Sequence, residues 1–182
     1  MNMHYRLQAP LLVAALLALP LAQAAMTRTD YDATKARIGV NYKADKLGCD
    51  ALAANAKDIC LEQAKARERI AGAELEYAYT GKASDLNQLR VTRAEATYAV
   101  ARERCDDLAG QVKDVCVSEA KTQETKALAD AKLGQQVGAA EQQAGEDKRA
   151  ADLKLATEKC DALAGDAKAA CVATAQASFG KP

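Results

Sequence analysis

The sequence predicts an all-α protein made of elongated antiparallel helical hairpins, or coiled coil, in which three helix-turn-helix repeats are each stapled by a disulfide bond. Three observations predict this fold. The three prolines stand at positions 10, 20 and 182, so the long stretch between the last two can be helical throughout. Ala, Glu, Lys, Leu and Arg make up more than half of that stretch, a composition typical of long helices. A motif bounded by two cysteines occurs three times.

Residues 1–24 are expected to be a cleavable signal peptide, which leaves residues 25–182 as the all-helical repeat region. The apolar run 11–19 is too short to span a bilayer as a helix, and Pro20 ends it. Ala22-Gln23-Ala24 supplies the small-x-small pattern that a signal peptidase needs. The alternative is an uncleaved N-terminal anchor. We expect a periplasmic protein with no transmembrane helix in the mature chain.

The repeated motif is Cys-Asp-x-Leu-Ala-(Gly/Ala)-x-x-Lys-x-x-Cys. It fills residues 49–60 (unit 1), 105–116 (unit 2) and 160–171 (unit 3) without gaps. The likeness extends outward, because Tyr42, Tyr98 and Leu153 each lie seven residues before the first cysteine of a unit. The three units match at so many positions that the chain contains an internal repeat.

Each unit is expected to reverse direction between its two cysteines. On one straight helix, residues eleven positions apart would be separated by about 16 Å, whereas a disulfide needs Cα atoms within about 7 Å. Glycine is the usual residue just past a helix C-terminus, and Asn or Asp often caps the next helix. We therefore expect turns near 53–56, 109–112 and 164–167, built on Ala54 and Asn55, Gly110 and Gln111, and Gly165 and Asp166. Ala54 stands where the other two units have glycine, so we expect the turn conformation of unit 1 to be less favourable.

Six cysteines allow fifteen pairings, and the repeat favours the one within units: Cys49–Cys60, Cys105–Cys116 and Cys160–Cys171. An oxidising compartment suits such bonds. Two alternatives are disfavoured. Zinc sites prefer shorter spacing and often histidine, and the only histidine, His4, lies in the expected signal peptide. Thiol-disulfide enzymes usually carry Cys-x-x-Cys, which this chain lacks.

Apolar residues between the units recur at helical spacing and indicate packing between neighbouring helices. One such seam runs Ile59, Ala66, Ile70, Ala73, Tyr77; another follows Val91, Ala94, Tyr98, Ala101. A break is expected near 80–84, around Gly81. Because the two seams share one heptad phase, a single helix that continues through residues 80–84 remains an alternative. Residues 134–145, rich in Gly and Gln, are expected to be a weak or bent stretch of helix.

The charge pattern and the residue inventory disfavour several function classes. Twenty-five basic residues balance twenty-five acidic ones, so no electrostatic footprint for nucleic acid is present. Ser84, Ser118 and Ser178 have no histidine beside them in the mature chain to activate a hydroxyl. Asp106-Asp107 is better explained as an exposed helix cap than as a catalytic pair. We expect no enzyme activity, no cofactor and no metal.

The signal peptide, the units and the Ala-Lys-Glu spacers together resemble a family of small proteobacterial periplasmic proteins, often called TolA-like cell-envelope proteins. The resemblance covers nearly the whole mature chain and implies no catalytic residues. We therefore expect a non-enzymatic helical scaffold, spacer or adaptor of the cell envelope, whose partners are other envelope proteins. The alternative is a protein-binding or chaperone-like module that acts in envelope stress.

Overall fold

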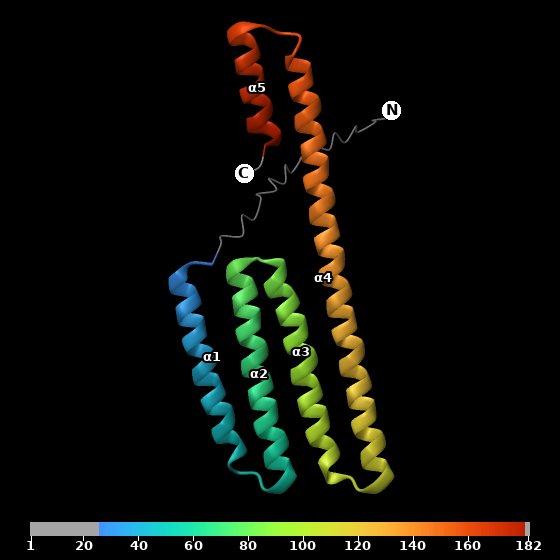
Figure 1. Cartoon of the computed structure of the whole chain (residues 1–182). Coiled ribbons are helices and arrows are strands. Elements are labelled where there is room, and N and C mark those ends of the chain that lie inside the picture. Colours follow the sequence, from blue (N-terminus) through green and yellow to red (C-terminus); the bar gives the residue numbers. More distant parts are fainter. Residues whose placement is uncertain (1–25, 181–182) are drawn as a thin grey trace, which may run out of the picture.

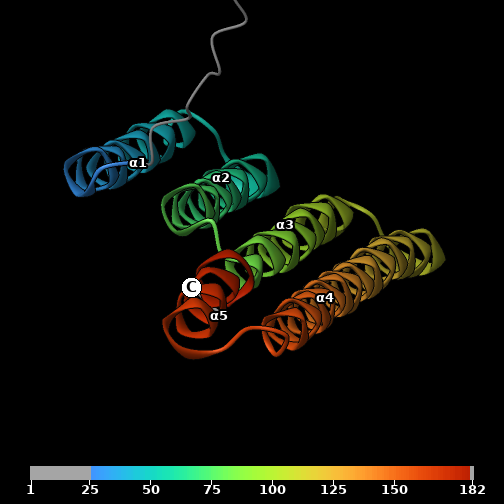
Figure 2. The same ribbon diagram turned by 90° about the horizontal axis from the view of Figure 1, so that it is seen from above.

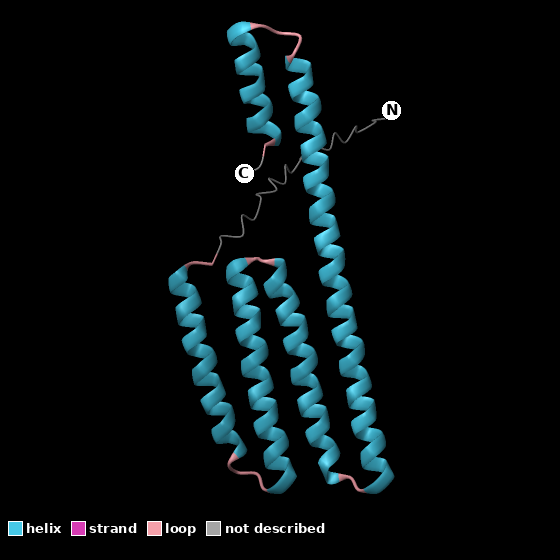
Figure 3. Cartoon of the chain, viewed as in Figure 1, coloured by secondary structure: helices cyan, strands magenta, loops and turns pink. Residues whose placement is uncertain are grey.

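The computed structural model describes residues 26–180, and this part of the chain consists of helices and short turns without any strand (Figure 3). The all-α prediction is confirmed. The predicted signal peptide, residues 1–24, lies outside the described residues. The elements, in chain order, are α1 (Arg28–Cys49), α2 (Ala54–Thr80), α3 (Ala83–Arg104), the 3₁₀ turn η1 (Cys105–Asp107), α4 (Gly110–Cys160) and α5 (Gly165–Phe179).

The helices form a single row in chain order rather than a closed bundle. Helices α1 to α4 lie side by side with alternating direction, and α5 folds back along the far part of α4 (Figure 1). Seen from above, the first four helices follow one another across the molecule, with α4 at the end of the row (Figure 2). Extensive contacts join only helices that are consecutive in the chain. Each interface is therefore a separate, local hairpin interface.

The interior of this row is thin, as the alanine-rich composition implies. The buried apolar side chains are mostly alanines and half-cystines, together with Leu75 and Leu89. Ion pairs add cross-links between neighbouring helices: Arg67 binds Asp45 across α1 and α2, and Arg69 binds Glu95 across α2 and α3. Exposed ion pairs stabilise by at most about 1 kcal/mol each. The disulfides are consequently a large part of what fixes the hairpins.

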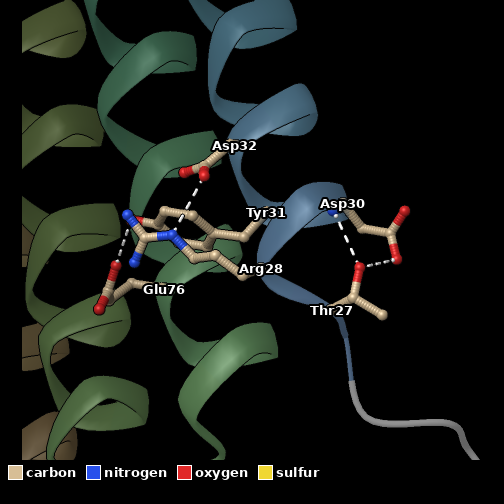
Figure 4. Close-up of polar contacts among 6 residues, drawn as sticks. All are labelled: Thr27, Arg28, Asp30, Tyr31, Asp32 and Glu76. Carbon is tan, nitrogen blue, oxygen red and sulfur yellow. Dashed lines mark hydrogen bonds and ion pairs between the residues drawn. The ribbon is translucent and has the colours of Figure 1, made fainter.

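The start of α1 shows how sequence chemistry sets a helix end (Figure 4). The Thr27 hydroxyl accepts a hydrogen bond from the Asp30 backbone N–H at 3.1 Å, which satisfies one of the unpaired donors at the helix N-terminus. The Tyr31 hydroxyl donates to the Glu76 carboxylate at 2.8 Å, and its ring packs against Tyr79 with ring centroids 4.7 Å apart. This hydrogen bond raises the pKa of Tyr31 and ties α1 to α2.

The expected break at Gly81 is present, and the continuous alternative is excluded. Helix α2 ends at Thr80, Gly81 adopts φ +65°, and α3 begins at Ala83. The left-handed conformation is the usual helix terminator for glycine. Helix α4, in contrast, runs without interruption through residues 134–145. The row thus contains a fourth reversal, between α2 and α3, that no disulfide closes.

The turns of the three units differ from the prediction in position. They lie at 50–53, 105–109 and 161–164, so the reversal comes about three residues earlier than expected. Ala54, Gly110 and Gly165 do adopt left-handed φ values of 49°, 55° and 56°, but each begins the following helix instead of ending the preceding one. A left-handed residue can redirect the chain at either boundary, and here the cysteine itself stands at the end of the first helix.

The expected cap residues are displaced by the same shift. Asn55 and Asp166, the expected caps, are second residues of their helices, as is Gln111 in unit 2. None of these three helix starts has a side-chain cap hydrogen bond. The Asn55 side-chain nitrogen is buried without a hydrogen-bond partner. The disulfides, not capping side chains, therefore hold these three helix starts in place.

Candidate functional site

The three hairpin tips, residues 49–60, 105–116 and 160–171, are the most regular feature of the molecule. Each is closed by the predicted disulfide within its own unit, Cys49–Cys60, Cys105–Cys116 and Cys160–Cys171, with Cα atoms 5.6, 5.8 and 5.7 Å apart. The first cysteine of each pair is completely buried. It joins the end of one helix to the second turn of the next, which fixes the angle between the two helices.

An ion pair crosses every tip, and sequence reasoning missed it. The Asp and Lys of the motif meet as Asp50–Lys57 at 3.0 Å, Asp106–Lys113 at 2.7 Å and Asp161–Lys168 at 3.0 Å. Their spacing of seven residues is not a contact spacing on one helix, where partners are three or four apart. The signal that could have found them is the presence of both residues in all three copies of the motif.

The motif leucine lies exposed at the apex of each tip. Leu52, Leu108 and Leu163 donate their backbone N–H to the carbonyl of the first cysteine, each at 3.0 Å. Their side chains are 43, 38 and 44% exposed, although large aliphatic residues are scarce in this protein. The disulfide, the ion pair and the turn hydrogen bond together constrain the backbone that carries this apolar side chain. A preorganised backbone lowers the entropy lost on binding.

The tips are distributed over both ends of the molecule. The turns of units 1 and 2 lie at one end of the row, and the turn of unit 3 lies beyond the other end (Figure 1). Helix α4, with 51 residues, separates the tips of units 2 and 3. At 1.5 Å per residue it is about 75 Å long. The arrangement can therefore hold partners a fixed distance apart.

The ion pair of unit 2 predicts a small pH dependence. The hydrogen bond from the Lys113 ammonium lowers the pKa of Asp106. A carboxyl with a depressed pKa contributes stability that is present above its unfolded pKa of about 3.9 and is lost as the pH falls through the folded value. We expect the Asp106 carboxyl to titrate below its ordinary range in a carbon-detected NMR titration, and Lys113→Gln to return it there. An unshifted Asp106 in the wild-type protein would contradict the ion pair.

A groove of about 490 Å³ runs between α3 and α4. Its floor is formed by small apolar side chains, among them Ala94, Ala101, Ala127 and Ala131, and Arg90, Arg93 and Asp130 lie along it. Glu124 is nearly buried there and accepts a hydrogen bond from Lys121 at 2.6 Å. The Lys121 ammonium also lies 4.9 Å from the centre of the Tyr98 ring. Such a groove can accept an apolar segment with a charged end.

The residues considered for catalysis are not brought together. Ser84 lies at the start of α3, Ser118 in the first turns of α4 and Ser178 near the end of α5. Ser84 donates a hydrogen bond to its neighbour Asp85. Among residues 26–180 no group of three His, Cys, Asp or Glu side chains could hold a metal ion. None of the helices in this range is both long and apolar enough to cross a bilayer.

Comparisons with protein-family models, with curated proteins and with solved structures found no match.

Proposed function

We propose that the chain is a non-enzymatic scaffold or spacer of the bacterial cell envelope, exported to the periplasm, whose hairpin tips contact other envelope proteins. The observation that carries this proposal is the repeated tip. The hairpin tip occurs three times, each time closed by a disulfide and with an exposed leucine. The helices that carry the tips form an open row with a thin interior. The disulfides fit an oxidising compartment. The resemblance of the motif to periplasmic envelope proteins supports the same location.

Export is tested on the expressed full-length chain. We expect the protein recovered from the periplasmic fraction to begin near Ala25, because Ala22-Gln23-Ala24 offers the cleavage pattern. N-terminal sequencing of this material decides the point. A protein that begins at Met1, or one that stays in the cytoplasmic fraction, would reject the export part of the proposal.

The role of the tips is tested by removing their apolar apices together. In a periplasmic crosslinking experiment, the variant Leu52→Ser/Leu108→Ser/Leu163→Ser should lose the partners that the wild-type chain captures and keep its helical circular dichroism. Val40→Ser, which removes an exposed apolar side chain in the middle of α1, serves as control and should capture them as before. Equal capture by the triple variant and the wild type would reject tip-mediated binding.

A second candidate function, a chaperone-like binder of unfolded proteins, is favoured by the groove between α3 and α4. Its test is suppression of the aggregation of a reduced client protein at equimolar concentration. Suppression by the wild type that Ala127→Lys abolishes would favour this function, because Ala127 lines the groove floor. The scaffold predicts no suppression by either protein.

A further inference from the structure

Helix α4 carries a stripe of exposed apolar residues along the side that its buried residues do not occupy. Its contacts with α3 and α5 use one face, marked by the buried Ala120, Ala131 and Cys160. At 3.6 residues per turn, the exposed apolar residues of α4 fall on the other side of the helix from these buried ones. Leu133 and Val137 also border a hollow beside the start of α3, and Leu155 borders one beside α5. We call this stripe the α4 edge; it comprises Val115, Ala129, Leu133, Val137, Ala140, Ala144, Ala151 and Leu155. Leu133, Val137 and Leu155 are 58, 48 and 52% exposed.

The internal repeat shows what this edge corresponds to. The first cysteines of the units are 56 and 55 residues apart, so the first half of α4 is equivalent to α2 and its second half to α3. The equivalent of Gly81 falls at 136–137 (81 plus 55 or 56), beside Gly138. Helix α2 ends at Gly81, whereas α4 continues through this point. Helix α4 is thus the straightened counterpart of the α2–α3 hairpin.

Both sides of the α2–α3 interface have counterparts on the α4 edge. Arg69 and Glu74 of α2 bind α3, and Ala73 and Tyr77 fall between them around the helix, on the side that faces α3. The equivalents of Ala73 and Tyr77, 56 residues on, are Ala129 and Leu133. Helix α3 buries Leu89 and Ala96, whose equivalents, 55 residues on, are Ala144 and Ala151. In a hairpin the two sets cover each other. In the straight α4 they lie one after the other along a single exposed stripe.

The charges that flank this interface are preserved as well. Glu74 of α2 binds Arg93 of α3. Their equivalents are Asp130 (74 plus 56) and Lys148 (93 plus 55), again acidic on the first side and basic on the second. Eighteen residues separate them, which is about 27 Å along a helix, so they cannot bind each other within one α4. The second pair, Arg69–Glu95, maps onto the uncharged Thr125 and Ala150.

We propose that two copies of this chain pair through the α4 edge, antiparallel, so that each half of one α4 contacts the other half of the second α4 as α2 contacts α3. Asp130 of each copy then binds Lys148 of the other, which places the two-fold axis near residue 139. Leu133 and Val137 come to lie opposite Ala144 and Ala140 of the second copy, large side chains against small. Such a contact is isologous and closes at two copies.

The rest of the fold accommodates this pairing. Helices α3 and α5 contact the opposite face of α4, and α4 stands at the end of the row (Figure 2). A second copy therefore extends the row beyond α4 without displacing any helix. This inference goes beyond the proposed function and does not depend on where the protein resides or on what its tips bind.

Sedimentation velocity over a concentration series tests the pairing. The disulfide-intact chain should form a dimer, and Lys148→Asp should raise its dissociation constant by about tenfold or more, because it places like charges opposite each other twice. Asp130→Lys/Lys148→Asp should restore the affinity. Lys132→Asp, a charge reversal on an exposed residue outside the edge, is the matched control and should dimerise like the wild type. A monomeric wild type, or equal affinity of Lys148→Asp and the control, would overturn the proposal.

The orientation is tested by chemical crosslinking near the axis. Ala140→Cys places a thiol on the edge close to its symmetry mate, whereas Gln142→Cys places one two residues further along the helix, on the same side of α4 as the buried Ala131 and Cys160. A short bismaleimide should link two copies through position 140 and leave position 142 unlinked. Both substitutions are at exposed helical sites, so unchanged circular dichroism verifies the fold. Preferential linkage through position 142 would contradict the antiparallel α4 edge contact.

Discussion

Replacing both Cys160 and Cys171 with Ser is expected to release α5 from α4 while the row α1–α4 stays folded. Helix α5 is 15 residues long and makes its extensive contacts with α4, and Ala175 is its one buried residue. An isolated helix of this length is marginal in water. A disulfide that closes a loop of this size stabilises by about 3 kcal/mol in the chain-entropy model. The interface between α4 and α5 is too small to replace that contribution.

Hydrogen exchange resolves this prediction by segment. The amides of 165–179 should lose most of their protection in the variant, and those of α2 and α3 should keep theirs. The matched variant Cys105→Ser/Cys116→Ser removes the same loop closure from unit 2. There α3 and α4 should remain docked at reduced stability, because Ala94, Ala120 and Ala131 are buried around their interface. Wild-type protection of α5 in the unit 3 variant would show that the small α4–α5 interface suffices alone.

The sequence predicted the helices and the disulfides because both follow from local rules. The stretch between Pro20 and Pro182 is rich in alanine and contains no proline, so it has few alternatives to helix. Eleven residues along one helix are too far apart for Cys105 and Cys116 to bond, so the turn between them was required. The pairing, confirmed in all three units, needed no knowledge of how the hairpins pack against one another.

What the sequence did not predict depends on choices that local rules leave open. A left-handed residue serves equally at a helix end and at a helix start, so Gly110 alone could not locate the turn to the residue. Gly81 ends a helix and Gly138 does not, although each lies within a helical pattern. Asp106 and Lys113 are seven residues apart, and this spacing predicts an ion pair only when the geometry of the turn between them is known. These features are set by tertiary contacts.

The left-handed position at the start of the second helix of each unit gives the second large expected effect. Ala54 adopts φ 49° there, where units 2 and 3 have glycine at 55° and 56°. A left-handed conformation costs a residue with a Cβ about 1–2 kcal/mol, and glycine adopts it freely. Ala54→Gly should therefore raise the free energy of unfolding by about 1 kcal/mol, because the greater flexibility of glycine in the unfolded chain offsets part of the gain.

The reverse exchanges should act in the opposite direction. An added Cβ at Gly110 or Gly165 meets no atom within 4 Å, so the backbone conformation is the main cost. Gly110→Ala and Gly165→Ala are each expected to lower the free energy of unfolding by about 1 kcal/mol. Denaturant unfolding under non-reducing conditions, followed by circular dichroism, measures all three variants. Gly145, in the middle of α4, is the control position, where the same Gly→Ala exchange should stabilise by about 0.5–1 kcal/mol because its conformation is helical. A loss of stability in Ala54→Gly would mean that Ala54 does not hold the left-handed conformation on which the shared tip geometry depends.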